Sequence, residues 1–269
     1  MKSRKPFYPY LVWMIFFTVI PLGMVLYYSF TDDAGAFSFD NLKYLTNPYI
    51  VRVYIDSLRM AFITTVICLV AGYPFAYIIS KMSVNKQRTM NMLIMLPMWM
   101  NFLLRIYAWM TLLESNGIIN NILVYFGLER QQLINNDGAV ITVMIYNFLP
   151  FMIIPIYTVM SKIDKSLIEA GQDLGCNGYN IFKRIVFPLS IPGVITGITM
   201  VFVPAASTFV ISQRLGNGMM IGDAIEQYYV GSSPNINMGS MLSLVLMIII
   251  VISMAIMNRF DKGEDAILI

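Results

Sequence analysis

The sequence predicts an all-α polytopic membrane protein whose single domain crosses the bilayer six times. Three observations predict this class. Hydrophobic residues make up 58% of the 269 residues and charged residues only 12%, which is about half the charged fraction of a typical soluble domain. The apolar residues form long runs. The Lys and Arg residues gather in alternate connections between those runs, as they do in membrane proteins with many spans.

Each spanning helix needs roughly 20 mostly apolar residues. Six runs meet this requirement, at about 8–30, 58–80, 91–113, 138–160, 189–211 and 239–258. The first run follows the basic stretch "MKSRKP" and resembles a secretory signal. However, it is long and no small-residue cleavage site follows it, so we expect it to be retained as a span.

The positive-inside rule orients these spans. Bases gather at the N-terminus, between the second and third spans, between the fourth and fifth spans, and in the tail: Lys2, Arg4, Lys5, Lys81, Lys86, Arg88, Lys162, Lys165, Lys183, Arg184, Arg259 and Lys262. The other three connections hold fewer bases and more acids. We therefore expect both termini and the segment 161–188 to lie in the cytoplasm.

The predicted spans contain many Pro and Gly residues, which bilayer helices tolerate where neighbouring groups satisfy the freed backbone. In the fifth span, Gly193 and Gly197 are four residues apart. This spacing allows close approach to another helix. It is also compatible with a bendable helix that lines a path, and the sequence leaves both readings open.

Composition excludes several classes of function. Histidine is absent, and Cys68 and Cys176 fit neither a disulfide framework nor a metal pair. The net charge of +3 is too small and dispersed to indicate a nucleic-acid partner. The chain contains no GxxxxGK[ST] phosphate loop. We therefore expect no enzyme activity, no metal and no cofactor bound by this chain.

The interiors of the six predicted spans lack Asp and Glu. Intramembrane carboxylates are typical of proton relays and ion-coupled carriers. Their absence favours a transporter driven by a separate energy source. A self-sufficient channel or secondary carrier is the alternative, and it predicts transport by this chain alone.

The stretch "EAGQDLGCNGYNIFKRIVFP" (169–188) is polar although apolar runs flank it. Its pattern predicts a short helix that begins after Ser161 or Asp164 and ends at Gly175. A turn at Asn177–Gly178 would begin a second short helix that stops at Pro188. One face of the first helix carries small and moderately apolar residues, namely Leu167, Ala170, Gly171 and Leu174. We expect a knob that docks into another protein, with a solvated loop as the alternative.

This stretch resembles the EAA loop of bacterial ABC-importer permeases. That motif reads Glu-Ala-Ala, three residues, Gly, nine residues, Ile-x-Leu-Pro, and this chain matches its spacing throughout, with Gly171 and Phe187 as the two departures. The resemblance implies the six-span type I importer permease fold and a coupling helix that inserts into a cytosolic ATPase. The residues implied in coupling are Glu169, Ala170, Gly171, Gly175, Ile185 and Pro188.

Three other stretches, 38–58, 96–109 and 207–229, are similar to the first permease subunit of spermidine/putrescine importers. This resemblance implies half of a translocation pore for polyamines. It also implies a homologous second permease subunit, two ATPase subunits that hold ATP and Mg, and an extracytoplasmic substrate-binding protein. Permeases for iron, thiamine and other small solutes share the scaffold, so another solute is the alternative.

Within the third predicted span, Asn101, Arg105 and Trp109 recur every four residues and should share a face. This stripe is a candidate translocation path, with Trp109 offering a cation–π contact to ammonium groups. Arg105 would repel a polycation. The competing interpretation is that Arg105 reaches outward to the surface or pairs with an acid such as Glu114.

Four acids are expected on the outer side: Asp56, Glu114, Asp223 and Glu226. They could receive a cationic cargo or a docked binding protein. The simpler expectation is that they are ordinary solvated carboxylates.

Overall fold

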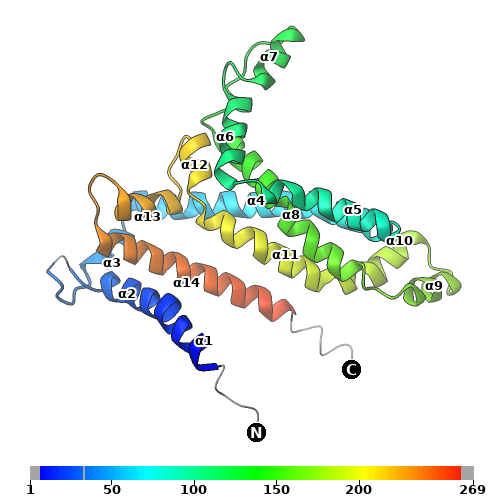
Figure 1. Ribbon diagram of the computed structural model, residues 1–269, viewed down its shortest axis with the longest axis horizontal. Helices are drawn as coiled ribbons and strands as arrows, with labels where there is room; N and C mark the ends of the chain where they lie inside the picture. The colour runs from blue at the N-terminus through cyan, green and yellow to red at the C-terminus, as the bar shows by residue number, and fades with distance from the viewer. Residues whose placement is uncertain (1–6, 33, 262–269) are drawn as a thin grey trace.

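The computed structural model describes residues 7–32 and 34–261, which fold into helices without a β-strand (Figure 1). In chain order the helices are α1 (Phe7–Met14), α2 (Ile20–Ser29), α3 (Asp40–Leu45), α4 (Pro48–Ser80), α5 (Val84–Met95), α6 (Phe102–Leu113), α7 (Ile118–Tyr125), α8 (Asp137–Met160), α9 (Lys165–Asp173), α10 (Gly178–Ile181), α11 (Phe187–Ser207), α12 (Val210–Leu215), α13 (Ile221–Val230) and α14 (Ile236–Asp261). Two π-helical turns, Ile15–Val19 and Phe182–Val186, and one 3-10 turn, Leu96–Trp99, continue neighbouring helices.

Five continuous helical segments are long and apolar enough to cross a membrane, and a sixth candidate is sharply bent. The five are Pro9–Ser29, Pro48–Ser80, Asp137–Met160, Gly178–Ser207 and Ile236–Met257. The sixth consists of Val84–Trp99 followed by Phe102–Tyr125 at an angle of 87°. The expected all-α membrane class is therefore confirmed, with six spans if the bent pair counts as one.

The second span begins at Pro48 rather than at the expected residue 58. The Asn47 side chain accepts a hydrogen bond from the Tyr49 backbone N–H at 2.9 Å, and Pro48 occupies the first helical position. Both features favour a helix start. The charges of Arg52 and Asp56 marked this stretch as a loop, but a helix can extend beyond the bilayer.

The third expected span, 91–113, is wrong as a single helix. The chain leaves α5 through the 3-10 turn that contains Pro97, becomes extended at Met100, and restarts as α6. The Asn101 side chain caps α6 by accepting from the backbone N–H groups of Leu103 at 2.8 Å and Leu104 at 3.4 Å. Proline disrupts helical hydrogen bonding and Asn is a preferred N-cap, so the sequence contained both causes of the break.

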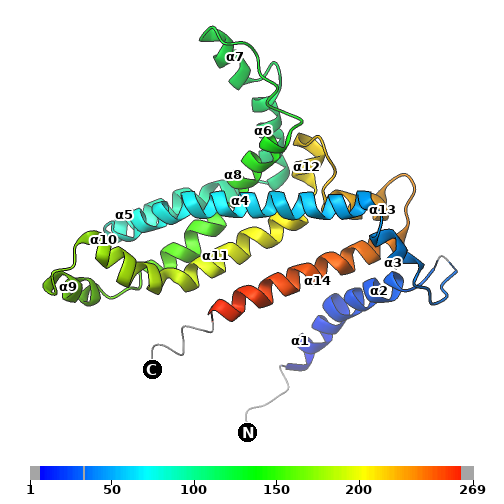
Figure 2. The same ribbon diagram turned by 180° about the vertical axis from the view of Figure 1, so that it is seen from behind.

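Helices α4, α8 and α11 form the centre of the molecule, and α14 lies alongside α11 with α2 packed on its far side (Figure 2). The glycine pair of the fifth span lies at the contact between α11 and α8. An ideal Cβ at Gly193 would be 2.9 Å from the Pro155 carbonyl oxygen, and one at Gly197 would be 2.8 Å from the Met152 sulfur. Close packing is therefore one role of these glycines.

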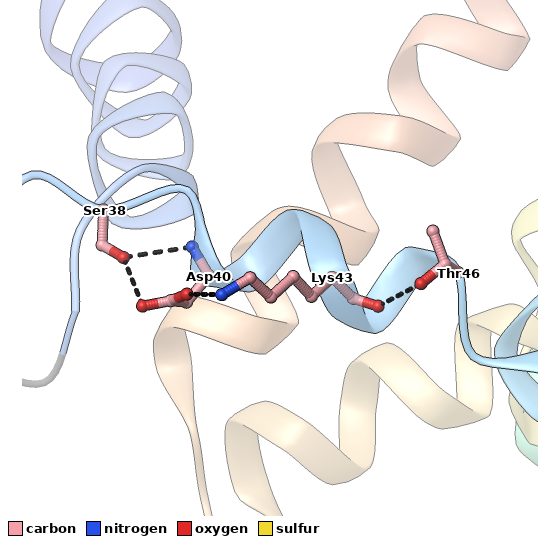
Figure 3. A network of polar contacts seen from close by, with 4 residues as sticks. All are labelled: Ser38, Asp40, Lys43 and Thr46. Atoms are coloured by element: carbon pink, nitrogen blue, oxygen red, sulfur yellow. Dashed lines mark hydrogen bonds and ion pairs between the residues drawn. The ribbon is translucent and has the colours of Figure 1, made fainter.

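The connection after the first span is organised by short polar contacts around α3 (Figure 3). The Ser38 hydroxyl donates to Asp40 at 2.9 Å, and Lys43 forms an ion pair with Asp40 at 2.5 Å. Hydrogen bonding by Lys43 and Ser38 lowers the pKa of the exposed Asp40 carboxyl. The buried amide of Asn41 donates to the carbonyls of Ser29 and Thr31, which attaches α3 to the end of α2.

We expect Gly193→Ala to weaken the α8–α11 contact, because the new Cβ would meet the backbone of Pro155 and Ile156 rather than a movable side chain. Overpacking of this kind costs about 1–3 kcal/mol. Thermal unfolding of the detergent-solubilised protein measures the effect. Gly23→Ala is the matched control, since a Cβ at Gly23 has no heavy atom within 4 Å. Equal melting temperatures for the two variants would contradict the prediction.

Candidate functional site

The coupling segment, residues 161–188, connects the central helices α8 and α11 and lies at the opposite end of the bundle from α3 and α13 (Figure 1). Its first helix, α9, begins where the Asp164 side chain accepts from the Ser166 backbone N–H at 3.0 Å. This hydrogen bond lowers the pKa of the Asp164 carboxyl. Of the two caps proposed from sequence, Asp164 is therefore the one used.

Gly175 ends α9, as predicted. Its φ is +78°, a conformation that glycine adopts without strain. The Gly175 N–H donates to the Gln172 carbonyl at 2.8 Å, and the Cys176 N–H donates to the Gly171 carbonyl at 3.0 Å. These two bonds make a Schellman motif, which satisfies carbonyls that would otherwise be orphaned at the helix end.

The second short helix begins as expected but does not stop at Pro188. The Asn177 side chain caps α10 by accepting from the Asn180 N–H at 2.9 Å. From α10 the helix passes through the π-helical turn Phe182–Val186 directly into α11, with Pro188 in its first turn. The wider π-helical turn accommodates the missing backbone N–H of Pro188. The proline therefore coincides with an irregular turn and does not end the helix.

The structure brings the two ends of the predicted motif together. Gly171 is buried, and an ideal Cβ on it would be 2.9 Å from the Ile185 Cδ1 atom and 3.6 Å from Ile181. Glu169 and Ala170 lie on exposed parts of α9. Gly171 thus provides the close contact that positions α9 on the following helix, while its neighbours are available to a partner.

An aromatic cluster that sequence reasoning missed joins the coupling segment to α4. The Phe182 ring lies 5.9 Å from the Tyr73 ring and 5.3 Å from the Tyr77 ring, and Phe187 lies 6.0 Å from Tyr73, measured between centroids. The hydroxyls of Tyr73 and Ser190 are hydrogen bonded at 2.9 Å. The sequence feature that could have predicted this cluster is the spacing of Tyr73 and Tyr77, which lie one helical turn apart.

A cleft of about 620 Å³ separates α9 from the connection between α4 and α5. Glu169, Gln172, Lys81 and Gln87 are among its lining residues. The Gln87 amide donates to the carbonyls of Ser80 and Met82, and its oxygen accepts from the Tyr157 hydroxyl at 2.9 Å. Gln87 therefore fixes one wall of the cleft to α8, and α9 forms the other wall.

The three predicted path residues have different surroundings. Asn101 is exposed and uses its side chain to cap α6. Arg105 is only 9% exposed, and its Nε and Nη1 atoms have no hydrogen-bond partner. Trp109 is half-buried and packs edge-on against Tyr146 of α8, with 5.4 Å between ring centroids. Among the described residues, no ion pair between Arg105 and Glu114 forms.

The outer acids are not all solvated. Asp56 is 39% exposed and lies 3.7 Å from Arg52, whereas Asp223 is 3% exposed. Asp223 lies on α13, outside the spanning helices, where it accepts from the Met220 N–H at 2.7 Å. Burial raises the pKa of Asp223 to about 6. For this residue, the expectation of an ordinary surface carboxylate is wrong, because the sequence does not show that α13 folds onto α14.

Comparison with known families identifies the scaffold. A family model described as the inner membrane component of binding-protein-dependent transport systems matches residues 72–265, which include the whole coupling segment. The chain belongs to this family. The resemblance to ABC-importer permeases is thereby confirmed, and with it the expectation of a transport subunit rather than an enzyme.

Two relatives match nearly the full length of this permease. The spermidine/putrescine transport system permease protein PotB of Haemophilus influenzae is 36% identical over 93% of this chain and 91% of its own length. The PotB protein of Escherichia coli is 33% identical over 88% of this chain and 92% of its own length.

Solved structures show the same fold. A bacterial ABC transporter that imports the acidic polysaccharide alginate contains a chain with a TM-score of 0.80 to this permease, at 16% identity, covering 95% of this chain and 93% of that one. The MetNI methionine ABC transporter gives a TM-score of 0.63 at 17% identity, covering 80% and 95%. At these identities the likeness establishes the importer permease fold and nothing about the solute.

Asp223→Asn tests the buried outer acid and keeps an acceptor for Met220. Because the folded-state pKa is raised above the ordinary value near 4, the stability that Asp223 contributes is present below about pH 4 and is lost as the pH rises through about 6. We expect the variant to melt about 2–4 °C above the wild type at pH 7 and to lose this advantage at pH 4. Thermal unfolding at both pH values measures it.

The exposed Asp173→Asn change is the control and should show no comparable difference between the two pH values. An Asp223→Asn advantage that is the same at pH 4 and pH 7 would contradict the assignment.

Proposed function

We propose that this permease forms half of the translocation pore of a polyamine importer. The observation that carries the proposal is its 36% identity, over nearly its whole length, to a spermidine/putrescine permease. Family membership places the chain among inner-membrane components that work with binding proteins. The span interiors provide no carboxylate trap, so most solute selectivity would reside in the extracytoplasmic binding protein.

In this proposal a homologous second permease completes the pore, and two cytosolic ATPase subunits bind ATP and Mg. The coupling segment docks on one ATPase through the exposed Glu169 and Ala170, while Gly171 and Ile185 hold α9 in place and Gly175 shapes the turn. Pro188 lies where the segment joins α11. Both termini lie in the cytoplasm, on the same side as α9.

ATP binding would act by shifting the population of pore conformations. Movement of α9 reaches α4 through the Phe182, Tyr73 and Tyr77 rings, and reaches α11 through the continuous helix of residues 178–207. The cleft between α9 and the Gln87 wall leaves room for that movement. The coupling segment is therefore joined to all three central helices, to α8 and α11 through the chain and to α4 through the aromatic rings.

Glu169→Ala should weaken ATPase attachment or uncouple ATP hydrolysis from transport, with little effect on membrane insertion, because the side chain is exposed. Co-purification of the ATPase and hydrolysis with and without loaded binding protein measure this. Asp173→Ala, another exposed acid of α9, is the control. Wild-type uptake and attachment in the Glu169 variant would exclude the docking assignment.

Cells that lack only this chain should lose uptake of labelled spermidine and putrescine, and restoring the chain should rescue it. Other polyamine systems are removed beforehand. Undiminished uptake would leave the family assignment intact and turn the search to other solutes.

In the same uptake assay, Trp109→Leu should raise the KM for the cargo if the Trp109 ring provides a cation–π contact. An unchanged KM would remove Trp109 from the path.

A further inference from the structure

Arg105 of α6 is a buried cation that has no counter-ion among the described residues. Arg105 is 9% exposed, and neither its Nε nor its Nη1 atom has a hydrogen-bond partner. Within the described residues its charge is met by the Phe102 ring, whose centroid lies 5.7 Å from the guanidinium carbon. A cation–π contact of this kind leaves the N–H donors of the guanidinium without acceptors.

No carboxylate among residues 7–32 and 34–261 forms an ion pair with Arg105. The two ion pairs of the described chain, Lys43–Asp40 and Arg52–Asp56, lie elsewhere. A buried charge is costly unless it is paired and hydrogen bonded, and intramembrane arginines are normally paired or face a water-filled cavity. Nε and Nη1 are enclosed by the described chain, so an anionic group from outside would meet the guanidinium at its remaining nitrogen, Nη2, and would supply the missing counter-charge.

The position of α6 indicates where that group comes from. After the 87° bend, α6 and α7 leave the bundle sideways as an arm, which both views show clearly (Figures 1 and 2). The arm exposes large apolar side chains, including Leu104 at 62%, Tyr125 at 85% and Phe126 at 73%. Such a surface suits lipid or another membrane helix better than a soluble protein.

A second arginine adds positive charge beside this arm. The guanidinium carbon of Arg214, on α12, lies 5.7 Å from the ring centroid of Tyr107 on α6. Arg214 is exposed and, within the described residues, is also without an ion pair. Two unpaired arginines against the same helix make the arm complementary to an anionic neighbour.

We propose that the α6–α7 arm packs against the second permease subunit and that a carboxylate of that subunit pairs with Arg105. This inference rests on the proposed function, which supplies a second permease in the same membrane. A polyamine cargo is cationic and cannot be the counter-ion. A carboxylate at Nη2 gives the guanidinium a charge-assisted hydrogen bond and a counter-charge, neither of which the ring contact provides. Arg105 is then an assembly residue, which places it outside the cargo contacts.

The test is a zero-length cross-link in the assembled transporter. Arg105→Lys places an amine at the site, and dicyclohexylcarbodiimide activates a neighbouring carboxylate, which the amine attacks to form an amide as the urea leaves. We expect a covalent product of both permeases whose linkage maps by mass spectrometry to position 105. Arg105→Gln should give no such product. An intact complex without an interchain cross-link at position 105 would overturn the proposal.

A second measurement covers the case in which Arg105→Lys does not assemble. A benzophenone amino acid replaces the exposed Leu104, one residue away, and is activated by light. A cross-link to the second permease supports the inference, and cross-links to lipid alone overturn it.

The neutral variant gives an independent readout. Loss of one partner of a buried charge pair is expected to reduce the second permease retained with Arg105→Gln by about tenfold or more. Arg52→Gln is the matched control, because Arg52 is exposed and already lies beside Asp56 in this chain. Equal retention in the two variants would contradict the pairing.

Purification of the wild-type complex distinguishes failure of this inference from failure of the proposed function. If a second permease co-purifies but position 105 does not contact it, the inference fails and the proposed function stands. If no second permease associates with the wild-type chain, the proposed function fails and the inference fails with it.

Discussion

The close contact between α8 and α11 is the constraint on which the rest of the structure depends. Gly193 and Gly197 allow the α11 backbone to approach α8 at Pro155 and Met152, where a side chain would collide with backbone or sulfur. The coupling segment is the connection between these same two helices. The position of the coupling segment is therefore set by how α8 and α11 pack.

Irregular helical turns determine whether neighbouring helices continue in line or bend. The π-helical turn Phe182–Val186 carries the chain past Pro188 without a break, whereas Pro97 and the cap at Asn101 produce the 87° bend between α5 and α6. Proline removes a backbone donor in both places. The outcome differs because the first site keeps helical dihedrals at every residue, while the second includes an extended residue, Met100, followed by a side-chain cap.

Among the described residues, the buried charged side chains are Arg105 and Asp223. Asp223 caps the first turn of its own helix through Oδ2, whereas its Oδ1 is buried without a hydrogen-bond partner, and burial raises its pKa. At Nε and Nη1, Arg105 has no such hydrogen bond within the described chain. Asp223 thus has a hydrogen-bond partner within its own helix, whereas we infer that the counter-ion of Arg105 comes from another subunit.

The sequence by itself determined the membrane class, the apolar runs and the approximate limits of the first coupling helix, which ends at Gly175 and has Ser161 or Asp164 as its cap. These features depend on nearby residues: apolar length, side-chain capping and the steric freedom of glycine act within a few positions of the chain. The family motif was readable for the same reason, since its spacing is local.

Only the tertiary structure decided that Gly171 meets Ile185, that Asp223 is buried, that the aromatic rings of α4 hold the coupling segment, and that Arg105 lacks an internal partner. Each of these depends on which helices lie side by side, and side-chain burial and pairing follow from that arrangement. The helical period places residues on a face but does not say what that face meets. The bend after Pro97 shows the same limit, because a proline and a capping residue permit a break, and the packing of α6 against α7 and α12 fixes its direction.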